Sequence, residues 1–109
     1  MKLWIDDVRP APEGYVWCKS VNEAIDKIVE VESNVNNIVK KAKYFDSIGN
    51  YGTADHFETE AANSYITLID IDHDSGVFFD DGGDYIRLLD WLEKMGKNYP
   101  IRIHSMNPV

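Results

Sequence analysis

Polar clusters follow three apolar runs of this chain, at the point where each run stops. The clusters are Asp6-Asp7 after residues 3–5, Asp72-His73-Asp74 after residues 65–71, and His104 with Asn107 after residues 101–103. Each run is typical of a buried parallel strand, so each cluster falls at a strand's carboxyl end. Ligands of open α/β sheets bind beyond these ends. We therefore expect one crevice lined by carboxylates and imidazoles, as a metal-phosphate or acid–base site requires.

Length and charge restrict the class of protein. The chain has 109 residues and is expected to form a single domain, residues 1–109. Its formal net charge of -8 argues against nonspecific binding to DNA, although a small phosphate could still bind through a metal. Cys18 is the single cysteine, which excludes a disulfide framework and a cysteine-rich zinc site. We see no signal peptide and no membrane span, so we expect a cytoplasmic protein without membrane contacts.

The N-terminal part is expected to contain two strands and a helix. Residues 2–6 and 15–18 have the composition of strands. Ser20 and Glu23 have the spacing of a capping box, which predicts a helix over residues 21–32. The loop between the two strands is too short for a helical crossover. Either this loop runs over the sheet edge, or the second strand is irregular.

The middle of the chain allows more than one interpretation. Apolar spacing continues through residues 35–45, as a second helix or as the first helix continued past Ser33. Gly49 and Gly52 are expected to break this helix. A short helix capped by Thr53 is predicted over residues 53–62.

The C-terminal part alternates strands with a helix. Residues 65–71 give the strongest strand signal, and residues 101–103 form another strand after Pro100. A helix is predicted from Tyr85 to Met95, with Gly96 just beyond its end. The order β-β-α-(α)-β-α-β favours an α/β fold with parallel pairing.

Two adjacent carboxylates at the end of a buried strand need compensation, because like charges repel and burial disfavours ionisation. A divalent cation such as Mg²⁺, Ca²⁺ or Mn²⁺ compensates with oxygen ligands. Alternation along the strand directs Asp6 and Asp7 to opposite sides, so one of them is expected to bind directly. The alternative is that one caps a turn and the other pairs with Arg9.

The later clusters offer further ligands and acid–base groups. Asp72 and Asp74 can face the same side as metal ligands, and His73 is either another ligand or a general acid–base group. The alternative is a local turn with an exposed histidine. His104 is either a satisfied boundary residue or part of the site, and its position favours the site. Hydrogen bonds to a phosphate oxygen could come from Ser105 and Asn107.

Several motifs resemble one known family. The opening Leu3-Trp-Ile-Asp-Asp-Val-Arg-Pro-Ala-Pro-Glu-Gly14 and residues 15–17 resemble the cyclic-phosphate processing receiver domain. Its later motifs correspond to Asp72-His-Asp74 with Gly76, Gly83-Asp-Tyr85, Trp91-Leu92 and Ile103-His-Ser-Met-Asn-Pro108. The resemblance covers roughly residues 1–30 and 65–109.

The resemblance implies a receiver-like, flavodoxin-type doubly wound fold with a mostly parallel sheet. Residues 31–64 exceed the family's usual link, so we expect a helical insertion there and a candidate surface for a protein partner. The chain is expected to lack the family's last helix and strand. Two sets of residues match the family's site: the receiver-like acidic positions Asp6, Asp7 and Asp72, and the distinguishing residues His73, Asp74, His104 and Asn107.

The function expected from this resemblance is processing of cyclic phosphates on nucleotides or RNA ends by a metal-dependent phosphoesterase. Asp6, Asp7, Asp72 and Asp74 would hold Mg²⁺ or Mn²⁺. His73 and His104 would serve as general base and general acid. Arg9, Ser105 and Asn107 are the expected substrate contacts. The alternatives are a signalling receiver phosphorylated on Asp72, against which His73 argues, and a nonenzymatic interaction module built on the middle segment.

Overall fold

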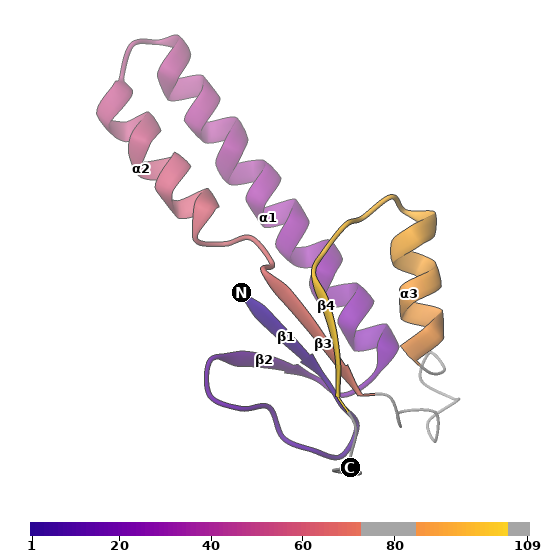
Figure 1. Cartoon of the computed structure of the whole chain (residues 1–109). Coiled ribbons are helices and arrows are strands. Elements are labelled where there is room, and N and C mark those ends of the chain that lie inside the picture. Colours follow the sequence, from indigo (N-terminus) through magenta and orange to yellow (C-terminus); the bar gives the residue numbers. More distant parts are fainter. Residues whose placement is uncertain (73–84, 105–109) are drawn as a thin grey trace. The chain divides into compact units, whose positions relative to one another are not determined.

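The computed structural model describes residues 1–72 and 85–104 (Figure 1). Four predicted site residues lie outside these ranges: His73, Asp74, Ser105 and Asn107. The chain divides into two compact units, Met1–Lys27 with Ile66–Val109, and Ile28–Tyr65. No helix within residues 1–72 and 85–104 combines the length and the apolar character needed to cross a membrane.

The order of the elements is the one that the sequence predicts. Along the chain they are β1 (Lys2–Ile5), β2 (Tyr15–Cys18), α1 (Val21–Ser47), α2 (Tyr51–Ala62), β3 (Leu68–Asp72), α3 (Tyr85–Lys94) and β4 (Ile101–His104). The main shift is in β3, which begins at Leu68, later than the predicted residue 65.

The described strands form one four-stranded, all-parallel sheet in the order β2-β1-β3-β4. The chain adds β2 on one side of β1 and then β3 on the other, so the strand order reverses between β1 and β3. This order matches the first four strands of a flavodoxin-type fold, whose ligand site lies at that reversal. The predicted receiver-like α/β fold is confirmed.

The two faces of the sheet differ in chemistry, because successive side chains of a strand point to opposite faces. One face carries buried aliphatic residues, each at most 1% exposed, including Leu3, Ile5, Ile69 and Ile71. On the other face the register pairs Trp4 with Asp70, Asp70 with Arg102, and Asp72 with His104. On this face polar groups therefore lie inside the strands as well as at their ends.

The connection between β1 and β2 contains no helix, yet β2 is a regular strand paired with β1 along its whole length. Of the two predicted alternatives, an irregular second strand is therefore wrong. Indole N–H groups hold the first part of the connection: Trp17 Nε1 donates to the Asp6 carbonyl at 2.6 Å, and Trp4 Nε1 to the Arg9 carbonyl at 2.9 Å. Gly14, at φ +86°, closes the turn before β2.

Helix α1 begins at the predicted cap and continues past Ser33, so the single-helix interpretation is the correct one. Ser20 Oγ accepts a hydrogen bond from the Glu23 amide at 3.0 Å, and the Glu23 carboxylate accepts one from the Lys19 amide at 2.5 Å. Val35 and Ala42 are buried, so the apolar face of the helix extends beyond the predicted end at residue 32.

Helix α2 corrects two predictions about its start. Its N-cap is Asn50, whose side chain accepts a hydrogen bond from the Thr53 amide at 3.3 Å, so Thr53 is not the cap. Gly52 lies inside the helix and does not break it, whereas Gly49 has a φ of +80° in the turn before it. Within residues 28–65, the rings of Phe45 and Phe57 stack and join α1 to α2.

Candidate functional site

Three predicted site residues meet where β1, β3 and β4 end. Asp6 follows β1, and Asp72 and His104 are the paired last residues of β3 and β4. Each residue offers one ligand atom, and these three atoms lie within 4.8 Å of one another. Both carboxylates are completely buried. Parallel strands deliver these groups together because their carboxyl ends share one edge of the sheet.

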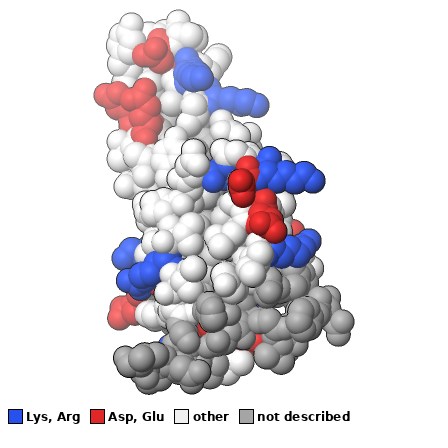
Figure 2. Space-filling model, turned by 45° about the vertical axis from the view of Figure 1, so that its right-hand side comes forward, with Lys and Arg blue, Asp and Glu red and all other residues white. Residues whose placement is uncertain are grey.

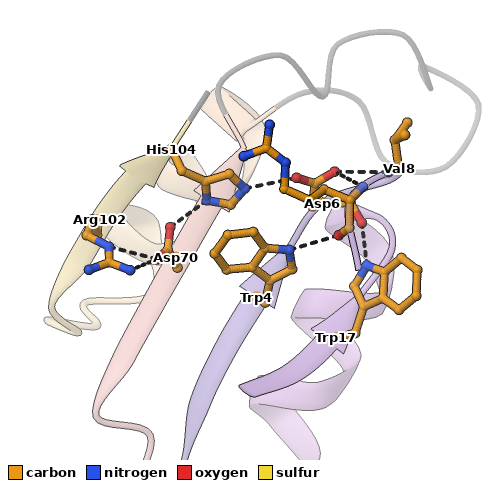
Figure 3. A network of polar contacts seen from close by, with 8 residues as sticks. Trp4, Asp6, Val8, Trp17, Asp70, Arg102 and His104 are labelled. Atoms are coloured by element: carbon orange, nitrogen blue, oxygen red, sulfur yellow. Dashed lines mark hydrogen bonds and ion pairs between the residues drawn. The ribbon is translucent and has the colours of Figure 1, made fainter. Parts of the chain in front are cut away.

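The imidazole of His104 lies between two carboxylates (Figure 3). Its Nε2 is 2.9 Å from Oδ2 of Asp6, and its Nδ1 is 2.5 Å from Oδ1 of Asp70. A carboxylate only accepts hydrogen bonds, so an imidazolium satisfies both contacts by donating from both nitrogens. The His104 side chain is 13% exposed, which leaves it partly open to solvent.

The plane of the His104 ring is set by Trp4. The two rings stack with centroids 3.8 Å apart and an interplanar angle of 8°. The Trp4 indole is itself fixed by its hydrogen bond to the Arg9 carbonyl. The imidazole is thus restrained by a ring face and by two hydrogen bonds at its edge.

Asp6 has two functions in this geometry. Its Oδ1 accepts hydrogen bonds from the amides of Val8 at 2.9 Å and Arg9 at 2.8 Å, which is the turn-capping role considered in the sequence. Its Oδ2 faces His104. Burial opposes ionisation, but the Arg9 and Val8 amides and the His104 ring together hold the pKa of Asp6 below its ordinary value. Asp6 is therefore a stable anion at neutral pH.

Asp7 does not join this group. Its side chain is half-exposed while Asp6 is buried, as expected for neighbours that point to opposite sides. Arg9, predicted to contact substrate, contributes its backbone to the network. Its amide donates to Asp6 and its carbonyl accepts from Trp4.

Asp70 belongs to the site and was missed in the sequence analysis. It lies inside β3, is completely buried, and contacts His104 through Oδ1. Its Oδ2 accepts from Arg102, at 2.8 Å from Nε and 2.6 Å from Nη2. The hydrogen bond and the charge of Asp70 raise the pKa of Arg102. The signal was an aspartate two positions before Asp72, on the same face of an otherwise apolar strand.

The described residues carry charged side chains of both signs on the face shown in Figure 2. That the protein does not bind DNA nonspecifically stays a prediction, which rests on the formal net charge of -8.

Comparison with protein-family models matches the N-terminal part of the chain. No curated protein and no solved structure matches the chain. The matching family model spans β1, the Asp6 turn, β2 and all of α1. It extends beyond the resemblance noted for residues 1–30 and ends before residues 65–109. Over residues 1–47 the chain matches the cyclic-phosphate processing receiver domain, which confirms the family resemblance in that segment.

Proposed function

We propose that this protein is a metal-dependent phosphoesterase that hydrolyses cyclic phosphates of nucleotides or RNA ends. The observation that carries the proposal is the meeting of Asp6, Asp72 and His104 at the carboxyl edge of the sheet. The family match over residues 1–47 supports cyclic phosphates as the substrate class.

The donor set suits a hard divalent cation. Asp6 and Asp72 offer carboxylate oxygens from completely buried side chains, and Mg²⁺ and Mn²⁺ prefer oxygen ligands. Asp70, a third buried carboxylate, is already paired with Arg102. We assign Asp6 and Asp72 as the residues that would hold the ion. When bound, the cation would supply charge neutralisation at the phosphate and activation of water.

His104 is suited to act as the general acid. With Nδ1 donating to Asp70, the proton on Nε2 is the one that can be transferred. Hydrolysis of a cyclic phosphodiester forms a bond from phosphorus to the water oxygen and breaks one ester bond. The departing oxygen takes a proton, which His104 Nε2 would donate. The predicted general base, His73, lies outside the described residues.

The decisive experiment measures hydrolysis of nucleoside 2′,3′- and 3′,5′-cyclic phosphates with Mg²⁺ or Mn²⁺ and with EDTA. We expect metal-dependent release of the monophosphate. His104→Gln should lower kcat about 10²–10⁴-fold, the usual contribution of a general acid.

The matched control is His56→Gln on α2, where the side chain is 72% exposed. This variant should retain the parental rate. Parental rates in His104→Gln, or hydrolysis that persists in EDTA, would contradict the proposed function.

A further inference from the structure

We propose that Asp70 is a positioning residue, which keeps a proton on Nδ1 of His104 and thereby directs Nε2 toward the Asp6 carboxylate. Its effect on catalysis rests on the proposed function, whereas its effect on the histidine does not. The proposal stands on the hydrogen-bond geometry of three side chains: Asp70, Arg102 and His104.

The first step concerns the direction of one hydrogen bond. Oδ1 of Asp70 lies 2.5 Å from Nδ1 of His104. An ionised carboxylate has no proton to give, so Nδ1 must be the donor. Arg102 donates to the other oxygen, Oδ2, so both oxygens of Asp70 act as acceptors in this geometry. Nδ1 therefore carries a proton whether the ring is neutral or charged.

The second step concerns the orientation of Asp70 itself. Its Oδ2 accepts from both Nε and Nη2 of Arg102, and Nη2 also donates to the Tyr15 hydroxyl at 3.2 Å. This contact fixes which oxygen faces Arg102 and leaves Oδ1 for His104. The stacked Trp4 ring fixes the plane of the imidazole.

The third step identifies the nitrogen available for proton transfer. Because Nδ1 is engaged with a completely buried carboxylate, only Nε2 faces the Asp6 side of the site. Asp70 thus acts through His104 and needs no contact with a substrate.

An asparagine at position 70 should reverse this arrangement. The side-chain amide has one acceptor, the oxygen, and one donor, the NH₂ group. Arg102 offers only donors, so the amide oxygen should turn toward Arg102 and the NH₂ group toward His104. Nδ1 would then have to accept, and a neutral ring would carry its proton on Nε2.

The test is a long-range ¹H–¹⁵N correlation spectrum of the full chain labelled with [¹⁵N]histidine, recorded in EDTA at neutral pH. His104→Gln assigns the signal, and exposed His56 is the internal reference. We expect a protonated Nδ1 in the parent and an unprotonated Nδ1 in Asp70→Asn. Arg102→Ala should keep the protonated Nδ1, because the Asp70 carboxylate is still present.

Several outcomes would overturn the proposal. A parental His104 with an unprotonated Nδ1 does so without any variant, which keeps the test decisive even if Asp70→Asn fails to fold. A folded Asp70→Asn variant that keeps the Nδ1 proton would also overturn the proposal. Loss of that proton in Arg102→Ala would overturn it as well.

Activity separates this inference from the proposed function. Asp70→Asn should lower kcat for cyclic-phosphate hydrolysis about 10²–10⁴-fold with little change in KM. A ring whose Nδ1 accepts a hydrogen bond is held neutral, and its Nε2 proton cannot leave without forming an imidazolate, so the general acid is lost while the substrate still binds. A parent protein that hydrolyses no cyclic phosphate refutes the function, and the histidine spectrum still decides the role of Asp70. Parental kcat in an Asp70→Asn variant with an altered spectrum would refute the catalytic part.

Discussion

Trp4 and His104 stack face to face, with ring centroids 3.8 Å apart, although β3 separates their strands in the sheet. Asp70 on β3 is the register partner of Trp4, and its Oδ1 contacts Nδ1 of the same His104 ring. The stack and the aspartate are therefore parts of one arrangement.

Replacing Trp4 should separate the contribution of the stack from that of the indole N–H. Trp4→Ala removes both and should lower the free energy of unfolding by about 3–5 kcal/mol, as for other large buried aromatics. Trp4→Phe keeps an aromatic face for His104 and loses the hydrogen bond to the Arg9 carbonyl, so we expect a loss of about 1–3 kcal/mol. Urea unfolding measures both values. Equal losses in the two variants would show that the aromatic face contributes nothing.

Metal binding should be visible as thermal stabilisation. A ligand that binds only the folded state raises its stability by mass action, by about 2.7 kcal/mol at a hundredfold excess over Kd. Millimolar Mg²⁺ or Mn²⁺ should therefore raise the Tm of the parent protein, and Asp6→Asn or Asp72→Asn should abolish the shift. Asp55→Asn, at an exposed position of α2, is the matched control and should respond like the parent. A parent protein whose Tm is unchanged by both metals would count against the proposed metal site.

The pKa of Asp6 predicts how stability changes in acid. Although burial opposes ionisation, the amides of Arg9 and Val8 and the ring of His104 hold its folded-state pKa below 3.8. Its contribution to stability is therefore complete above that ordinary value and is lost as the pH falls through the lower folded-state pKa. In EDTA, Asp6→Asn should lose less stability than the parent below about pH 4. Urea unfolding across this range tests the prediction, and identical pH profiles for parent and variant would contradict it.

Phosphorylation distinguishes the proposed enzyme from a signalling receiver. Incubation with acetyl phosphate should leave Asp72 unmodified, because we propose that this carboxylate holds a metal for hydrolysis. Intact mass and peptide mapping provide the measurement. A stoichiometric, acid-stable and base-labile phosphoryl group on Asp72 would favour the signalling alternative.

The site could be predicted from the sequence only where it depends on strand ends. Apolar runs that stop at polar residues indicated that Asp6, Asp72 and His104 lie at one edge, and the structure brings these three together. Asp70 and Arg102 lie inside strands and were not recognised. Their pairing depends on the register between β3 and β4, which a single sequence does not specify.

Helix boundaries show a similar limit. The Ser20–Glu23 cap was predictable because the motif is local and has one arrangement. Asn50 and Thr53 are both good capping residues, and composition alone did not decide between them. In the structure Thr53 supplies the amide that Asn50 caps, so the helix begins earlier.

The parallel pairing of β1 with β2 has a consequence for the order of folding. Lys2 pairs with Tyr15 across a short connection, while the contact of His104 with Asp6 closes a sequence separation of 98. Closing a short loop loses less chain entropy than closing a long one. The β1–β2 ribbon is therefore favoured as an early structure, and the carboxylate–histidine cluster can form only when β4 docks. A kinetic experiment should find that the quenching or shift of Trp4 emission by His104 appears in the last folding phase.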